Sequence, residues 1–242
     1  MNRLIKEKIK RSSMWIFVII CLTIVLSITI KYHFIGEVNM PFKPDEMLVI
    51  SACEGIANDD NPEGYRWNLD LVQYNDIYIH FAKSNDDQVH IRNVTIENVK
   101  CEGIEGIKTY MPSSKEGTKF EYNDDYEIRS SLTFKGNEND DHKNLKICSN
   151  GGSILFRVAN FNLGKLQSNT DEIIYDGRLL KDANISLESL RFTLKFDILL
   201  DTSNDIIYRG TFVVDMPCGN IIEDGTSKLD KTDLSDVIFK RD

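Results

Sequence analysis

The hydrophobic pattern divides the chain into one continuous apolar run and a long remainder in which apolar and polar residues alternate. The run, Met14 to Ile30, holds seventeen residues without a charge, a glycine or a proline. Extended to Ile35, it makes a helix of roughly 33 Å, enough to cross a typical hydrocarbon core. Trp15 and Tyr32 lie near its two ends, where amphipathic rings prefer the membrane interface. The pattern therefore predicts one transmembrane anchor over Met14–Ile35.

Positive charge on either side of the run predicts its direction. Residues 1–13 carry five Lys or Arg against one Glu, a net +4, whereas residues 31–43 carry two Lys against one Glu, a net +1. Because basic flanks stay in the cytoplasm, we expect tail 1–13 inside and the bulk of the chain outside.

Three alternatives fit the run less well than an anchor. A cleaved signal peptide needs a small-x-small site after a shorter apolar region, and the nearest match, Ser27-Ile28-Thr29, lies inside the run. A lipoprotein needs a small residue before its cysteine, but Cys21 follows Ile20. A buried helix of a soluble protein seldom has so long an uncharged stretch.

Beyond residues 36–45, the pattern is typical of strands. We expect 36–45 to be a linker, because Pro41 and Pro44 oppose both helix and ladder pairing. About ten strands follow, at 47–53, 67–71, 77–81, 89–99, 107–111, 126–134 (interrupted at Ser130), 145–147, 154–158, 190–200 and 207–215. The clearest is 190–200, which is apolar at every second position.

The spacing of these runs predicts several local features. We expect 77–81 and 89–99 to form a hairpin, with a bulge near Asn93 where the apolar phase changes. Asn150-Gly151-Gly152 predicts a second hairpin, and residues 202–205 predict the turn of a third. A short helix is expected within 182–190, capped by Asn184 or Ser186. The fold class is mainly β: residues 46–242 form an all-antiparallel sandwich of the jelly-roll or immunoglobulin-like kind.

Charge and cysteines limit what this domain contains. The chain has a net charge of −9, so removing the +4 tail leaves −13 for the rest, which argues against nucleic-acid binding. The exported part has an even number of cysteines, which permits up to two disulfides in any of three pairings. These residues are Cys53, Cys101, Cys148 and Cys218. The alternative is that they are buried free thiols, and the absence of a C-x-x-C pair argues against zinc.

No common catalytic motif is present: the sequence lacks a Walker loop, G-x-G-x-x-G, H-E-x-x-H, G-x-S-x-G and an EF-hand loop. An N-terminal anchor, an exported β-domain and a cysteine after a strand together give an architecture that resembles sortases, which are cysteine transpeptidases. The resemblance implies Cys218 as nucleophile, His80 or His142 as base, and Arg209 or Arg241 as oxyanion stabiliser. Asp215-Met216-Pro217-Cys218 departs from the T-L-x-T-C sequence of sortases, so the resemblance covers architecture alone.

Calcium is a second chemical possibility, since Ca²⁺ prefers oxygen ligands on loops. Three loops rich in Asn and Asp supply the candidate ligands Asp59, Asp60, Asp124, Asp125, Asp140 and Asp141. Solvated turns have the same composition, and none of these loops has the spacing of a known calcium site. A pair of carboxylates for glycoside hydrolysis cannot be chosen among so many acids.

A pair of histidines and a group of aromatic residues are two further candidate sites. His80 and His90 would face each other if the expected hairpin had the matching register, but no third ligand for a metal is visible. Tyr65, Trp67, Tyr74 and Tyr78 would make a sugar- or peptide-binding surface if they shared a face, although strand aromatics are usually core.

The sequence thus predicts a single-pass membrane protein with an extracytoplasmic β-domain. Usage rich in Ile, Asn, Lys and Asp favours a bacterial cell envelope. We expect a non-catalytic binding or envelope-assembly module, with no cofactor, that contacts the bilayer through Met14–Ile35 and an envelope protein or glycan outside. The alternative is an anchored envelope enzyme, either transpeptidase-like or glycan-active.

Overall fold

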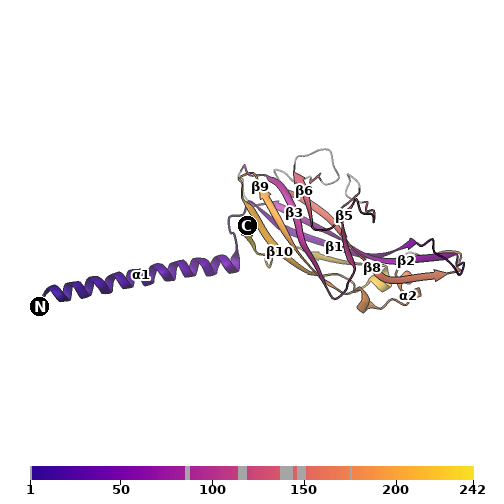
Figure 1. The fold of residues 1–242 in the computed structure, drawn as a ribbon, viewed down its shortest axis with the longest axis horizontal. Coiled ribbons are helices and arrows are strands. Elements are labelled where there is room, and N and C mark those ends of the chain that lie inside the picture. Colours follow the sequence, from indigo (N-terminus) through magenta and orange to yellow (C-terminus); the bar gives the residue numbers. More distant parts are fainter. Residues whose placement is uncertain (1, 85–87, 114–118, 137–143, 146–150, 175) are drawn as a thin grey trace.

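A long helix leads into an elongated sandwich of strands (Figure 1). This computed structural model describes residues 2–84, 88–113, 119–136, 144–145, 151–174 and 176–242. Helix α1 (Asn2–Ile35) is continuous, so the basic tail extends the anchor helix. Its segment Ser13–Ile35 has a mean hydropathy of 2.6 and is 0% buried, and among the described residues it is the one helix long and apolar enough to cross a membrane.

The strands form two six-stranded sheets. The first, sheet A, has the order β11 (Thr226–Lys231), β1 (Phe42–Ala57), β2 (Trp67–Lys83), β8 (Gly151–Ser168), β4 (Ile107–Tyr110), β5 (Glu127–Ile128). The second, sheet B, has the order β12 (Phe239–Arg241), β10 (Ile207–Asp215), β9 (Thr193–Thr202), β3 (Ile91–Glu102), β6 (Ser131–Gly136), β7 (Asn144–Leu145). The prediction of a mainly β, sandwich-like domain is confirmed. Among the described residues, the strand pairs are antiparallel except the short parallel pair β6–β7, so the prediction that every pair is antiparallel is wrong there.

The main core lies between the two sheets and follows from the period-two pattern. In β9, Leu194, Phe196, Ile198 and Leu200 are fully buried, whereas the residues between them are half-buried or exposed. Aromatic rings connect the sheets: Phe156 of sheet A meets Phe196 edge to face at 5.3 Å, and Phe196 stacks on Phe212 at 5.2 Å. Such offset and edge-to-face pairs add to the free energy of burying the rings.

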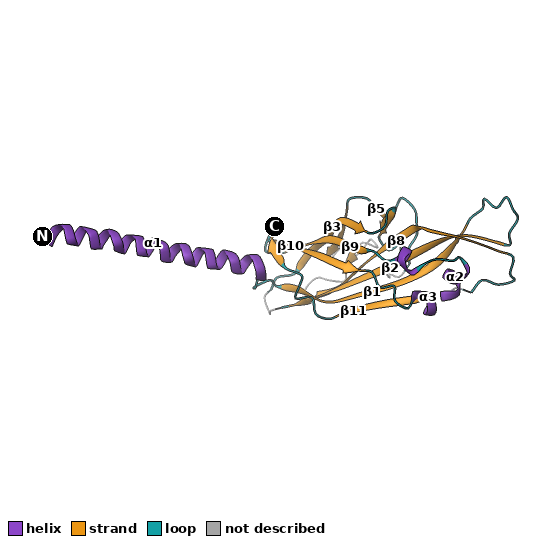
Figure 2. Cartoon of the chain, turned by 90° about the horizontal axis from the view of Figure 1, so that it is seen from below, coloured by secondary structure: helices purple, strands orange, loops and turns teal. Residues whose placement is uncertain are grey.

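A second, smaller core packs against sheet A. It lies at the end of the sandwich where the short helices are, away from α1 (Figure 2). It is covered by α2 (Gly177–Asp182), the 3-10 helix η1 (Leu187–Leu190) and α3 (Ile221–Asp224). The helix predicted within 182–190 is therefore only η1, with Ser186 as its N-cap residue. The strand predicted to start at residue 190 begins at Thr193 instead, after this turn.

The prediction of a hairpin between 77–81 and 89–99 is wrong. Strand β2 lies in sheet A between β1 and β8, while β3 lies in sheet B beside β9, so the chain changes sheet between them. His80 and His90 therefore do not face each other. The bulge near Asn93 is confirmed by the register shift between Ile91 and Asn93 against β9. The hairpin turn predicted at 150–152 lies partly outside the described residues. The strands before and after it, β7 and β8, belong to different sheets.

The expected linker is partly strand. β1 begins at Phe42, and Pro44 pairs with Phe81 of β2, next to a register shift before Glu46. β11 pairs with β1 only from Met47 onward, so Pro44 lies at a bulge on an edge, where a missing N–H is tolerated. Phe42 is 0% exposed in the main core, so the sandwich begins within a few residues of the anchor.

We predict that the stacked phenylalanines carry much of the stability. Phe196→Ala should lower the free energy of unfolding by about 3–5 kcal/mol, because it leaves a cavity between Phe156 and Phe212. Val213→Ala, at a side chain 59% exposed, is the control and should change it by less than about 0.5 kcal/mol. Urea unfolding of the full chain in detergent measures both. Equal effects of the two substitutions would contradict the prediction.

Candidate functional site

The end of the anchor is joined to the last strand, β12. The backbone N–H of Glu37 donates to the carbonyl of Phe239 at 2.8 Å, and the N–H of Arg241 donates to the Tyr32 hydroxyl at 3.0 Å. The Arg241 guanidinium also pairs with the Glu37 carboxylate at 2.7 Å. Gly36 makes this approach possible, since its φ is +74° and a Cβ there would lie 2.3 Å from the Phe239 carbonyl oxygen.

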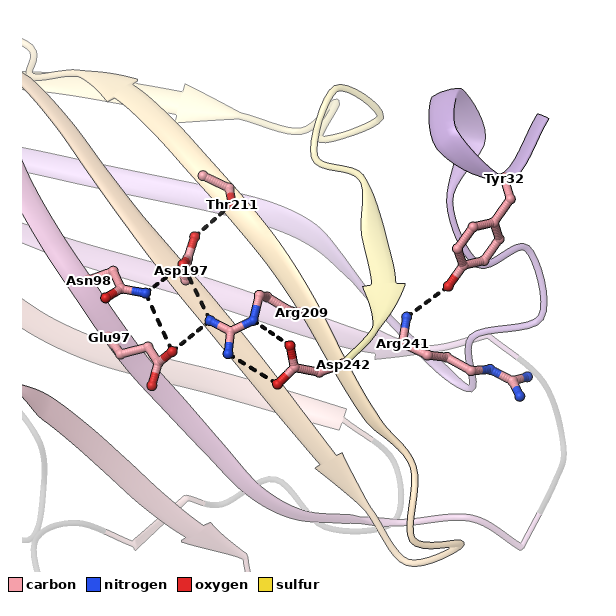
Figure 3. A network of polar contacts seen from close by, with 8 residues as sticks. All are labelled: Tyr32, Glu97, Asn98, Asp197, Arg209, Thr211, Arg241 and Asp242. Carbon is pink, nitrogen blue, oxygen red and sulfur yellow. Dashed lines mark hydrogen bonds and ion pairs between the residues drawn. The ribbon is translucent and has the colours of Figure 1, made fainter. Parts of the chain in front are cut away.

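The residue after β12 is in turn fixed to sheet B (Figure 3). Arg209 of β10 donates to both carboxylate oxygens of Asp242, at 2.7 and 3.1 Å, and to Glu97 at 2.6 Å. The hydrogen bond from Arg209 holds the pKa of the Asp242 carboxyl below its usual value. Arg209 also reaches Asp197 at 3.3 Å, and Asp197 accepts from Thr211 at 2.6 Å. We call the contacts of residues 32–37 with β12, together with this network around Arg209, the anchor clamp.

A cleft of 640 Å³ is lined by residues of β3, β4 and β5 and of the segments beside them. It lies beside two connections between the sheets. One runs from β3 of sheet B to β4 of sheet A, and the other runs from β5 of sheet A through Arg129 and Ser130 to β6 of sheet B. Its apolar lining includes Val99, Ile107 and Ile128. Its polar lining includes the Lys108–Glu127 ion pair at 2.9 Å. Its volume of several hundred Å³ is typical of binding sites, and its exposed lining is more polar than apolar.

The residues proposed for transpeptidase chemistry are far apart. Arg209 and Asp215 lie on β10 about 20 Å apart by strand rise, and Cys218 follows beyond Asp215. The two arginines are already paired, Arg209 with three carboxylates and Arg241 with Glu37.

The proposed bases are no closer to the thiol. His80 contacts Asp45 near the start of β1 at 2.6 Å. Along β2, His80 lies about 23 Å by strand rise from Gln73. Gln73 donates to the carbonyl of Leu190, which shares a core cluster with Cys218. The small cleft beside Cys218 has no histidine among its described lining residues, and His142 lies outside the described residues.

The thiols are free in the structure where they are described. Cys53, Cys101 and Cys218 are unbonded, and Cys148 lies outside the described residues. Burial raises the pKa of the Cys53 thiol to about 12, with the nearby Glu54 carboxylate adding to the effect. Burial alone raises the pKa of Cys101 to about 11. A nucleophilic cysteine needs the opposite shift, toward the thiolate.

The acidic loops are mostly held by their own hydrogen bonds. The N–H of Asp60 donates to the side chain of Asn58, and the N–H of Asp125 donates to that of Asn123. Asp124 pairs with Arg129 at 3.1 Å. In the part of the chain that the structure describes, no three His, Cys, Asp or Glu gather as metal ligands. Asp140 and Asp141 lie outside that part.

The aromatic residues considered in the sequence do not form one surface. Tyr74 and Tyr78 lie on the outer face of sheet A, whereas Tyr65 and Trp67 lie at the start of β2, where the Trp67 indole donates to the Thr170 carbonyl at 3.0 Å.

The outer face of sheet A instead carries a cluster around Arg157, which sequence reasoning did not find. The guanidinium lies 3.9 Å from the ring centroid of Tyr74 and 4.2 Å from that of Phe120, and it donates to both oxygens of Asp76 at 2.6 and 2.9 Å. Burial raises the pKa of the neighbouring Tyr122, whose hydroxyl donates to Glu54. Since its charge is paired and its faces covered, Arg157 fastens residues 119–128 onto the sheet rather than offering an open site.

Comparison with protein-family models, curated proteins and solved structures finds no match for this chain.

We predict that Cys101 is a slow nucleophile although it lines the cleft. At neutral pH its raised pKa leaves almost all of it as the thiol, so alkylation by iodoacetamide should be much slower than in the urea-unfolded chain. The native rate should rise with pH until about 11, the pKa of the folded state. Peptide mass spectrometry at several pH values measures it. A fast native reaction at pH 7 that levels off below pH 9 would contradict the assignment.

Proposed function

We propose that the chain is a membrane-anchored module of a bacterial cell envelope that binds a protein or glycan partner outside the cytoplasmic membrane without chemical turnover. The tail 1–13 lies in the cytoplasm, and the sandwich stands on the outer side. We further propose that this sandwich is of the jelly-roll or immunoglobulin-like kind, since two antiparallel sheets share one core.

The anchor clamp is the observation that carries this proposal. A defined height and orientation at the membrane limits which partners the sandwich can reach, and this geometry suits a binding or assembly module. Here β12 fastens the sandwich to Tyr32 and Glu37 at the end of the helix. Tethering also raises the local concentration of the module near partners in the same membrane.

The 640 Å³ cleft is the proposed binding site. Its lining combines apolar residues such as Ile107 and Ile128 with the charged residues Lys108, Glu127 and Arg129. A partner that extends an apolar group between the two crossovers would meet these charges at the edge, which provides orientation and specificity.

We predict that a photoreactive amino acid at position 129 captures the partner in living cells. The control is the same amino acid at position 171, whose Asp side chain is 97% exposed and belongs to another part of the sandwich. Irradiation should give one adduct of defined mass at 129, lost when Lys108→Glu reverses the charge at the cleft edge. An identical pattern at 129 and 171, or no adduct at either, would contradict the proposal.

A further inference from the structure

A groove of 360 Å³ lies where the anchor meets the sandwich. Its apolar lining comes from three places in the sequence: the end of α1, the segment before β1, and the segment before and within β12. These residues include Ile35, Val38, Met40, Leu234, Val237 and Phe239. Ile35 is the last residue of the apolar span, so the groove is continuous with the surface that the anchor presents to lipid.

The contacts of β12 place this groove level with the end of the apolar span. Arg241 bonds to Tyr32, and Lys240 lies 3.5 Å from the Nδ1 of His33; both partners belong to the span Ser13–Ile35. The tip of the sandwich therefore lies beside the last turn of the span. In a membrane crossed by that span, this is the level of the lipid headgroups.

Part of the apolar surface here has no protein cover. In the groove lining, Ile35 is 57% exposed and Val38 56%, whereas Met40, Leu234 and Phe239 are buried against the sandwich. Exposed apolar surface of this kind marks a site that something else covers, and acyl chains are the apolar material at this depth.

One ammonium of the groove is available to an anion. Of its two carboxylates, Glu37 pairs with Arg241 at 2.7 Å and Asp45 contacts His80 at 2.6 Å. Lys43 also lines the groove, and it has no ion-pair partner among the described residues. An ammonium next to an apolar groove at headgroup level matches a phosphate linked to an acyl chain.

We propose that this groove binds one glycerophospholipid of the outward-facing leaflet. An acyl chain lies along Ile35, Val38 and Val237, and the phosphate lies at Lys43. The inference rests on the proposed function, because it requires α1 to cross the bilayer with the sandwich outside.

The test is photo-cross-linking of the full chain in nanodiscs that contain a phospholipid with a diazirine in its acyl chain. Peptide mapping should find adducts within 232–239, far in sequence from the anchor, as well as within 13–35. Val38→Asp places a charge in the groove at an exposed position, so it should abolish the adducts in 232–239 while those in 13–35 persist. Val213→Asp, equally exposed but on sheet B, should leave both sets unchanged.

A second variant tests the phosphate contact separately. Lys43→Gln should lower the yield in 232–239 about tenfold, the effect of losing one hydrogen bond to a charged group. It should have no effect when the diazirine is carried by a diacylglycerol, which lacks the phosphate. Adducts confined to 13–35, or yields in 232–239 that neither variant changes, would overturn the assignment.

Failure of this inference is distinguishable from failure of the proposed function. Retention in membranes after alkaline carbonate, and labelling of Asp171→Cys in intact cells by a membrane-impermeant maleimide, test the anchor and its direction. A chain that passes both but gives no adduct in 232–239 has the proposed anchor without the lipid site. A chain that is released by carbonate fails the proposed function and this inference with it.

Discussion

The close approach of Gly36 to β12 is the constraint on which the arrangement of helix and sandwich depends. The chain leaves the helix in a left-handed conformation and passes within hydrogen-bonding distance of Phe239, which only a glycine permits. From there Phe42 enters the core six residues later. The segment between the anchor and the sandwich therefore has almost no free length. Its backbone is held by the sheet edge on one side and the helix end on the other.

This attachment continues into the body of the domain. Phe239 packs edge to face against Phe212 at 6.2 Å, Phe212 stacks on Phe196, and Phe196 meets Phe156 of sheet A. Asp242 adds a second connection through Arg209. An aromatic series and an ion-pair network thus run from the end of the anchor across sheet B, and the aromatic series reaches sheet A. Because close-packed interiors transmit displacement, the sandwich and the helix end are expected to move together.

Local pattern predicted the elements well and their partners poorly. The long apolar helix and the alternation of β9 follow from the hydrophobicity of consecutive residues, and both occur as predicted. The assignment of β2 and β3 to different sheets depends on long-range pairing with β8 and β9, which no short window contains. The sequence alone predicts that Pro44 prevents strand pairing. It does not show that β11 pairs with β1 only from Met47 onward, which leaves Pro44 on an unpaired edge of β1.

The site was less predictable still. The cleft arises from two crossovers between sheets, and the clamp joins residues that are about two hundred positions apart in sequence. The resemblance to sortases implies a catalytic role for Arg209 or Arg241 beside Cys218. Their roles in the structure follow from the nearby carboxylates Glu97, Asp242 and Glu37, and cross-strand register decides that proximity.

The most direct test of the clamp is the distance distribution between two nitroxide amino acids, one at position 19 in the anchor and one at position 213 on sheet B. Both positions carry exposed side chains, so the labels do not disturb packing. Measured by double electron–electron resonance on the full chain in nanodiscs, the account predicts one narrow distribution, which broadens in the double variant Tyr32→Phe, Arg241→Ala. A distribution already broad in the unmodified clamp would contradict it.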